Sequence, residues 1–296
     1  MASALSSPAE VAHPSEPQDK MGGRERGRGT VAGWRSVILF GLLTFAISGI
    51  LSLLALPIVH LPWWKVFRRC VSIGAGLSVL ICIKGIERRS IRSYGFFAPR
   101  EGRSELLFGL LLGVGTLLMM FGLGLATGAY HVAIDGHPLK LWGSVVGLIP
   151  AMAMVGVLEE LVFRGIILQR LAVSSKPMAL VVSSALYAVV HLKTLAPTWG
   201  LLGPWFELVG LFLFGSILCV SFFLTRQLYL AVGLHAALAY GALINKLFLE
   251  FPRPSLNWLI GTNRLVNGVM NWIALLVMCG VMVWWVRSAR WQRRVT

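Results

Sequence analysis

Two adjacent carboxylates and an arginine lie inside a strongly apolar stretch of this chain. Residues 151–172 read AMAMVGVLEELVFRGIILQRLA, and the charges near its centre are Glu159, Glu160 and Arg164. A charge at the middle of a membrane helix costs roughly 2.5–3.5 kcal/mol, whereas Leu, Ile, Phe and Val each return only about 0.3–0.6 kcal/mol. We therefore expect this helix to face other helices or a water-filled cavity, with partners for its charges.

Helical spacing gives the three charges different surroundings. Glu160 and Arg164 are four residues apart, so they lie on one face of a helix and can pair. Glu159 points about 100° away from Glu160, which leaves its carboxylate available for chemistry. Ionisable groups inside membrane helices commonly mark functional sites. The alternative is a buried structural ion pair with a spare acid beside it.

Two histidines lie in other apolar runs of the sequence. His191 follows Tyr187 by one helical turn in SSALYAVVHL, and His235 lies in LYLAVGLHAALAYGAL. With Glu159, they form an acid and base set that could activate water, or a metal site with glutamate and histidine ligands. The spacing does not match the helical HExxH zinc motif. The alternative for each histidine alone is a packing role in a core.

The elements that must position these groups are membrane helices. Of 296 residues, 56% are hydrophobic and 13% are charged, against about 25% charged residues in soluble domains. The sequence predicts an all-α, polytopic integral membrane helix bundle with about eight transmembrane helices. The apolar runs are 37–59, 66–84, 105–126, 144–172, 177–193, 206–225, 228–248 and 269–286. The run at 66–84 is the weakest, because two arginines intrude at its start, and the count drops to seven if it does not cross.

The chain divides into a tail and one membrane domain. Residues 1–33 are rich in Ser, Pro, Gly and charge, which predicts a disordered basic tail. Residues 34–290 are expected to form the membrane-embedded domain, with core motifs at 159–239. The four cysteines lie in apolar runs without metal-ligand spacing, so we expect buried free thiols.

Basic residues are unevenly distributed between the predicted loops. With eight spans and a cytoplasmic N-terminus, the inside segments hold 18 Lys and Arg residues and the outside segments hold 8. Lys and Arg accumulate in cytoplasmic loops, so both termini are predicted to be cytoplasmic, although the basic cluster at 65–69 opposes this. The net charge of +15 is then a topology signal and a source of contacts with membrane lipids, and no nucleic-acid partner is expected.

The order of the motifs resembles the CPBP family (CAAX proteases and bacteriocin-processing proteins, also called Abi) over about residues 100–285. This is the family of the type II CAAX prenyl endopeptidases. Its EExxxR motif is matched in full by Glu159, Glu160 and Arg164. The first motif is short but specific when it occurs inside an apolar helix.

The second and third family motifs are present with changes. The usual Phe-xxx-His is here Tyr187-xxx-His191, a mild change that leaves Tyr187 as a supporting residue. The usual His-xxx-Asn is here His235-xxx-Ala239, so the third motif is degenerate and its amide is missing.

The resemblance implies a hydrolase: an intramembrane endopeptidase that cleaves membrane-associated protein or peptide substrates. Glu159 would be the general base, and His191 would hold and polarise the attacking water. His235 would stabilise the oxyanion, while Glu160 and Arg164 would form a supporting pair. An older interpretation of the family makes it a zinc metalloprotease, with Glu159, His191 and His235 as ligands of Zn²⁺; the first interpretation needs no cofactor. The sequence does not choose between them.

The missing amide at Ala239 is the reason for the main alternative to an endopeptidase function. Losing one oxyanion-hole donor costs about 10²–10³ in rate, so Ala239 predicts a slow enzyme. Asn245 lies about 15 Å beyond His235 along the helix, and Tyr240 lies on another face, so neither replaces the amide. The alternative function is a catalytically weak or inactive relative that acts as a bacteriocin-immunity or membrane scaffold protein.

Two further expectations concern the surroundings of the site. Glu207, close to the start of an apolar run, is expected at the membrane interface, outside the site. A proton-coupled carrier would also use buried Glu and His, but the sequence has no internal repeat of the kind that carriers show. By resemblance, we expect an integral protein of the bacterial cytoplasmic (inner) membrane.

Overall fold

The computed structural model describes residues 19–295, except 87, 89, 98, 134–137, 193–202 and 263–264. The N-terminal half contains α1 (Asp19–Ala55), α2 (Trp63–Leu80), η1 (Ile81–Ile86), η2 (Ile91–Tyr94), α3 (Pro99–Ala126), β1 (His131–Val132) and α4 (Pro138–Glu160). The C-terminal half contains η3 (Leu161–Leu168), α5 (Gln169–Ala172), α6 (Lys176–His191), α7 (Gly203–Thr225), α8 (Tyr229–Phe248), β2 (Leu249–Glu250), η4 (Pro254–Leu256), α9 (Asn257–Ile260) and α10 (Val269–Val295).

The described part of the chain is a polytopic membrane helix bundle, as the composition predicted. Each of the eight predicted apolar runs is helical over most of its length, and seven helical segments among the described residues are long and apolar enough to cross a membrane. The weakest predicted run lies in one of the seven, Trp63–Ile86. The eighth predicted span, at 177–193, corresponds to the shorter helix α6. Its 16 residues extend about 24 Å, which is less than the hydrocarbon thickness of about 30 Å.

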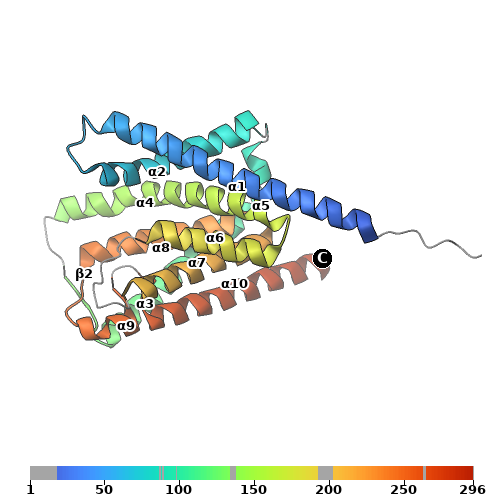
Figure 1. The fold of residues 1–296 in the computed structure, drawn as a ribbon. Helices are drawn as coiled ribbons and strands as arrows, with labels where there is room; N and C mark the ends of the chain where they lie inside the picture. The colour runs from blue at the N-terminus through green and yellow to red at the C-terminus, as the bar shows by residue number, and fades with distance from the viewer. Residues whose placement is uncertain are drawn as a thin grey trace, which may run out of the picture.

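Helix α8 lies in the core of the bundle and packs against α3, α4 and α7. Helix α6 packs along α7 and against η3. Helices α1 and α2 form a hairpin and pack mainly against each other, as Figure 1 shows. The hairpin contacts the other helices of the bundle mainly through α5 and η3. The strands β1 and β2 form a two-stranded antiparallel ladder, with Val132 opposite Leu249, which connects the ends of α3 and α8.

Helices α3 and α8 approach each other closely at two glycines. A Cβ on Gly233 of α8 would lie 2.5 Å from the carbonyl oxygen of Leu106, and a Cβ on Gly109 of α3 would lie 2.5 Å from that of Leu230. Small residues at such crossings allow backbones of membrane helices to come together. This contact fixes the position of α8 only two residues before His235.

The helix that carries the Glu-Glu motif changes geometry directly after Glu160. Helix α4 ends there, and Leu161–Leu168 form the π-helix η3, in which all eight residues are buried. A π-helix is wider than an α-helix, and such segments are frequent at functional sites. Hydrophobic periodicity predicted the helix here, but the change from α to π geometry was not predicted.

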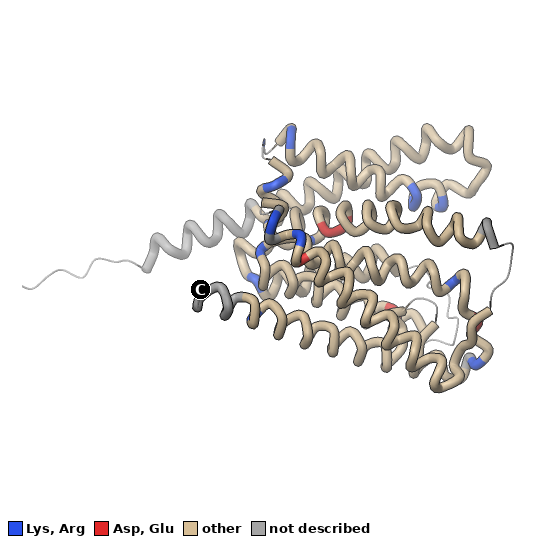
Figure 2. The backbone as a smooth tube through the Cα atoms, turned by 180° about the vertical axis from the view of Figure 1, so that it is seen from behind, with Lys and Arg blue, Asp and Glu red and all other residues tan. Residues whose placement is uncertain are grey.

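The apolar helices alternate in direction, so the N-terminal end of α1 and the C-terminus lie at the same end of the bundle (Figure 1). Many of the Lys and Arg residues gather at that end, as Figure 2 shows. Residues 1–18 of the predicted tail lie outside the described residues. Helix α1 begins at Asp19, so it includes the last part of the predicted tail, which was expected to end at residue 33. The disorder of the tail stays a prediction. The four cysteines are free.

Candidate functional site

Three helical segments bring the motif residues together. Glu159 and Glu160 are the last two residues of α4, Tyr187 and His191 lie in the last turns of α6, and His235 lies on α8. These residues are separated by as many as 76 positions in the sequence. Their proximity therefore depends on how α4, α6 and α8 pack.

Helix α6 has a well-defined start that determines where its two site residues lie. The side chain of Ser175 accepts a hydrogen bond from the backbone N–H of Met178 at 3.4 Å, and Pro177 occupies the first turn. Serine at the cap and proline in the first turn are both favoured at helix starts. The hydroxyl of Ser183 donates to the carbonyl oxygen of Phe163 at 3.1 Å, which joins α6 to η3 beside the site.

Glu160 and Arg164 form an ion pair in the interior of the bundle. Arg164 Nη1 donates to Glu160 Oε1 at 2.9 Å, and both side chains are 0% exposed. Arg164 Nη2 donates to the carbonyl oxygen of Gly215 at 2.9 Å, and the guanidinium carbon lies 4.9 Å from the centre of the Tyr187 ring. The pairing that helical spacing predicted is thus present, and α7 supplies a second acceptor.

Glu160 has a second partner that the sequence gave no reason to expect. His235 Nδ1 lies 2.7 Å from Glu160 Oε1, the same oxygen that Arg164 contacts. Because the ion-paired carboxylate accepts hydrogen bonds, Nδ1 of His235 is the donor. The other ring nitrogen, Nε2, is therefore the atom that His235 presents to the cavity.

Glu159 lies apart from this ion pair and contacts both histidines. Its Oε2 is 2.9 Å from His191 Nε2 and 3.4 Å from His235 Nε2. The side chains of Glu159 and His191 are each 25% exposed, unlike the fully buried Glu160. His191 Nδ1 donates to the carbonyl oxygen of Tyr187 at 2.8 Å, so His191 also presents Nε2. The two histidines thus direct equivalent nitrogens at one carboxylate oxygen.

These groups border a single cavity of about 310 Å³, which is lined by Glu159, Tyr187, His191, His235 and Ala239. Most of its remaining wall consists of apolar side chains contributed by α3, α4, α7, α8 and α10. A mostly apolar cavity with a few converging polar groups is the usual form of a ligand site.

One face of α8 forms a long wall of this cavity. His235, Ala239, Ala242, Leu243 and Lys246 all line it, at the spacing that places residues on one face of a helix. From His235 to Lys246 this face extends about 16 Å. The two alanines leave open space along the wall, and exposed Lys246 stands at the end away from the histidines.

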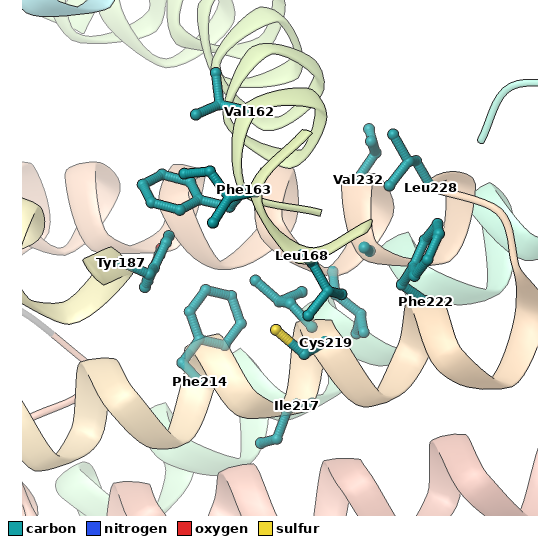
Figure 3. Close-up of a cluster of buried hydrophobic side chains, with 14 of the residues drawn as sticks. Val162, Phe163, Leu168, Tyr187, Phe214, Ile217, Cys219, Phe222, Leu228 and Val232 are labelled. Carbon is teal, nitrogen blue, oxygen red and sulfur yellow. The ribbon is translucent and has the colours of Figure 1, made fainter. Parts of the chain in front are cut away.

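Aromatic rings hold Tyr187 in place beside the polar cluster. Its ring centre lies 5.2 Å from that of Phe163 and 6.1 Å from that of Phe214, both edge to face. Figure 3 shows Phe163 and Phe214 on either side of Tyr187. His191 stacks on Tyr187 with centres 4.1 Å apart. The Tyr187 hydroxyl lies 3.5 Å from His235 Nε2.

The structure places Glu207 differently from the prediction made from the sequence. We expected it at the membrane interface and outside the site, and the second part was wrong, because Glu207 is 6% exposed and lines the cavity from α7. It also interacts with other groups of the protein. An acid within an apolar run is the signal that could have placed it inside.

Glu159, His191 and His235 are the residues that the zinc interpretation names as ligands. Among the described residues, no group of three or more His, Cys, Asp or Glu side chains is arranged to hold a metal ion. The Glu159 carboxylate contacts one ring nitrogen of each histidine directly. The zinc interpretation therefore stays a prediction from the resemblance.

Comparison with protein families gives one finding. Residues 141–241 match the family model described as type II CAAX prenyl endopeptidase Rce1-like. The matched segment runs from α4 into α8 and contains all the motif residues, including Ala239. A comparison with curated proteins gives no match.

Proposed function

Residues 141–241 are a domain of the Rce1-like type II CAAX prenyl endopeptidase family, and from this we propose that the protein is an intramembrane endopeptidase. Its substrates would be proteins or peptides in or at the membrane. One observation carries the proposal: Glu159 lies within ion-pair distance of both His191 and His235 at a cavity inside an apolar helix bundle.

Glu159 is the general base in the proposed reaction. A water molecule gives a proton to Glu159 as its oxygen adds to the carbonyl carbon of the peptide bond. His191, with Nε2 at 2.9 Å from Glu159 Oε2, positions this water. The proton then passes from Glu159 to the leaving nitrogen as the C–N bond breaks. The products are one new carboxyl terminus and one new amino terminus.

His235 stabilises the negative charge on the carbonyl oxygen. Because Nδ1 already donates to Glu160, Nε2 donates to the oxyanion from the doubly protonated ring. Glu160 orients this ring, as a buried carboxylate does for a catalytic histidine. Arg164 in turn fixes Glu160 and acts as a positioning residue.

Ala239 is the observation that favours a second function. It lines the cavity one helical turn after His235, where the family motif usually has an amide. With that donor absent, the protein would be a weak or inactive relative that acts as an immunity or scaffold protein in the membrane.

New protein termini distinguish the two functions. Membranes that carry the wild-type protein are compared with membranes that carry Glu159→Gln at matched expression. Glu250→Gln is the control, because Glu250 is exposed on β2. We expect termini that are present with the wild type and the control but absent with Glu159→Gln, and these would identify the substrates. Identical termini in all three, with all three folded, would favour the immunity or scaffold function.

A further inference from the structure

Two positions of this chain depart from the family motifs, and both border the same cavity. Tyr187 replaces the usual phenylalanine, which adds a hydroxyl. Ala239 replaces the usual asparagine, which removes an amide. The added hydroxyl lies 3.5 Å from His235 Nε2, the atom assigned above to the oxyanion. The chain has thus lost one hydrogen-bond donor near this atom and gained another.

We propose that Tyr187 is a catalytic residue, and that its hydroxyl donates a hydrogen bond to the oxyanion in place of the amide that is missing at Ala239. The inference rests on the proposed function and adds a residue to its chemistry. It assigns the oxyanion two donors, His235 Nε2 and the Tyr187 hydroxyl. Ala239 then does not mark an inactive site.

The surroundings of Tyr187 suit this role. Tyr187 is 3% exposed, and its ring is held between Phe163 and Phe214, with the Arg164 guanidinium on its face. A donor whose direction is fixed before the reaction needs no reorganisation when charge develops. A separation of 3.5 Å from His235 Nε2 is too long for a strong hydrogen bond between them. The Tyr187 hydroxyl and His235 Nε2 are therefore close enough to donate to one shared oxygen.

The hydroxyl acts in the addition step. As the water oxygen bonds to the carbonyl carbon and its proton goes to Glu159, the C=O electron pair moves onto the carbonyl oxygen. The Tyr187 O–H and His235 Nε2–H hydrogen-bond to this oxygen. When the C=O bond re-forms and the C–N bond breaks, both hydrogen bonds weaken and Tyr187 keeps its proton.

The other tyrosine and lysine side chains near the α8 wall of the cavity are not placed to contact the oxyanion. The Tyr240 hydroxyl donates to the carbonyl oxygen of Val145 at 3.3 Å, and Tyr240 does not line the cavity. Lys246 lines it but lies about 16 Å from His235 along α8. Tyr187 is therefore the hydroxyl placed to share an oxygen with His235.

The test is a double-mutant cycle on the full-length protein in detergent, with a substrate peptide identified from the new termini. Tyr187→Phe should lower kcat about 100-fold with little change in KM, because the donor acts mainly in the transition state. Adding Ala239→Asn should restore kcat at least tenfold. Tyr240→Phe is the matched control and should leave kcat unchanged. Both replacements create the residue that the family motif usually has, so we expect every variant to fold, and thermal denaturation checks this.

A second measurement does not need turnover. A peptide phosphinate carries charged tetrahedral oxygens like those of the intermediate, and Tyr187→Phe should weaken its binding by a similar factor, with recovery on adding Ala239→Asn. The inference is overturned if kcat and phosphinate affinity of Tyr187→Phe stay within threefold of wild type, or if Ala239→Asn restores nothing. If the wild type cleaves no more than Glu159→Gln does, the proposed function fails. If the wild type cleaves and Tyr187→Phe cleaves at the same rate, only this inference is overturned.

Discussion

At the scale of single residues, one carboxylate oxygen organises the polar interior. Glu160 Oε1 contacts both Arg164 Nη1 and His235 Nδ1, so the ion pair and the candidate oxyanion donor are linked through one atom. Glu160 and Arg164 are wholly buried, and a buried charge needs partners to offset its desolvation. Arg164 therefore contributes to stability and to the orientation of His235.

Arg164→Met should destabilise the protein by about 3–5 kcal/mol, because it leaves the Glu160 charge buried without its main partner. Thermal denaturation and folded yield in detergent measure the effect. Lys176→Met is the control, since Lys176 is exposed at the start of α6. The double variant with Glu160→Met should recover stability in part but not cleavage, because His235 loses its acceptor. An unchanged melting temperature for Arg164→Met would exclude a stabilising ion pair.

At the scale of elements, helix α8 determines the shape of the site. One face carries His235 and the open cavity wall, and the opposite contacts with α3 depend on Gly109 and Gly233. The π-helix η3 is the second decisive element, because it carries Arg164 between α6 and α7. Neither feature follows from a single helical periodicity.

Gly233→Ala should lower stability by about 1–3 kcal/mol, because the added methyl group forces α8 away from α3. It should also reduce cleavage, since His235 is two residues away. Gly147→Ala on α4 is the matched control: a Cβ there meets no atom within 4 Å, so stability and cleavage should not fall. Equal melting temperatures for the two variants would contradict the close approach of α3 and α8.

At the scale of the whole molecule, the alternating helices place the start of α1 and the end of α10 at one end of the bundle (Figure 1). The protein is an integral membrane protein with multiple spans. The short helix α6 still returns the chain across the bundle, so seven long helices do not put the termini on opposite sides. Many Lys and Arg residues gather at the end that holds the start of α1 and the end of α10 (Figure 2). Because these residues accumulate on the cytoplasmic side of membrane proteins, we predict that this end is cytoplasmic.

Reporter fusions test this orientation. Fluorescent protein fused to either terminus should fluoresce in bacterial cells, and a periplasmic alkaline phosphatase fused to either terminus should be inactive. A fusion between α3 and α4, in the predicted outside segment, is the positive control for the phosphatase. Fluorescence at one terminus combined with phosphatase activity at the other would contradict an even number of crossings.

The sequence by itself determined the membrane helix bundle, because hydrophobic runs of sufficient length have few alternatives to helices in lipid. It also determined the pairing of Glu160 with Arg164, because both lie on one helix at fixed spacing. Only the tertiary structure decided that Glu160 also contacts His235, that Glu207 lines the cavity and that the Tyr187 hydroxyl lies near His235. These contacts join residues of different helices, and the packing between helices depends on glycines and side-chain shapes that no local pattern encodes.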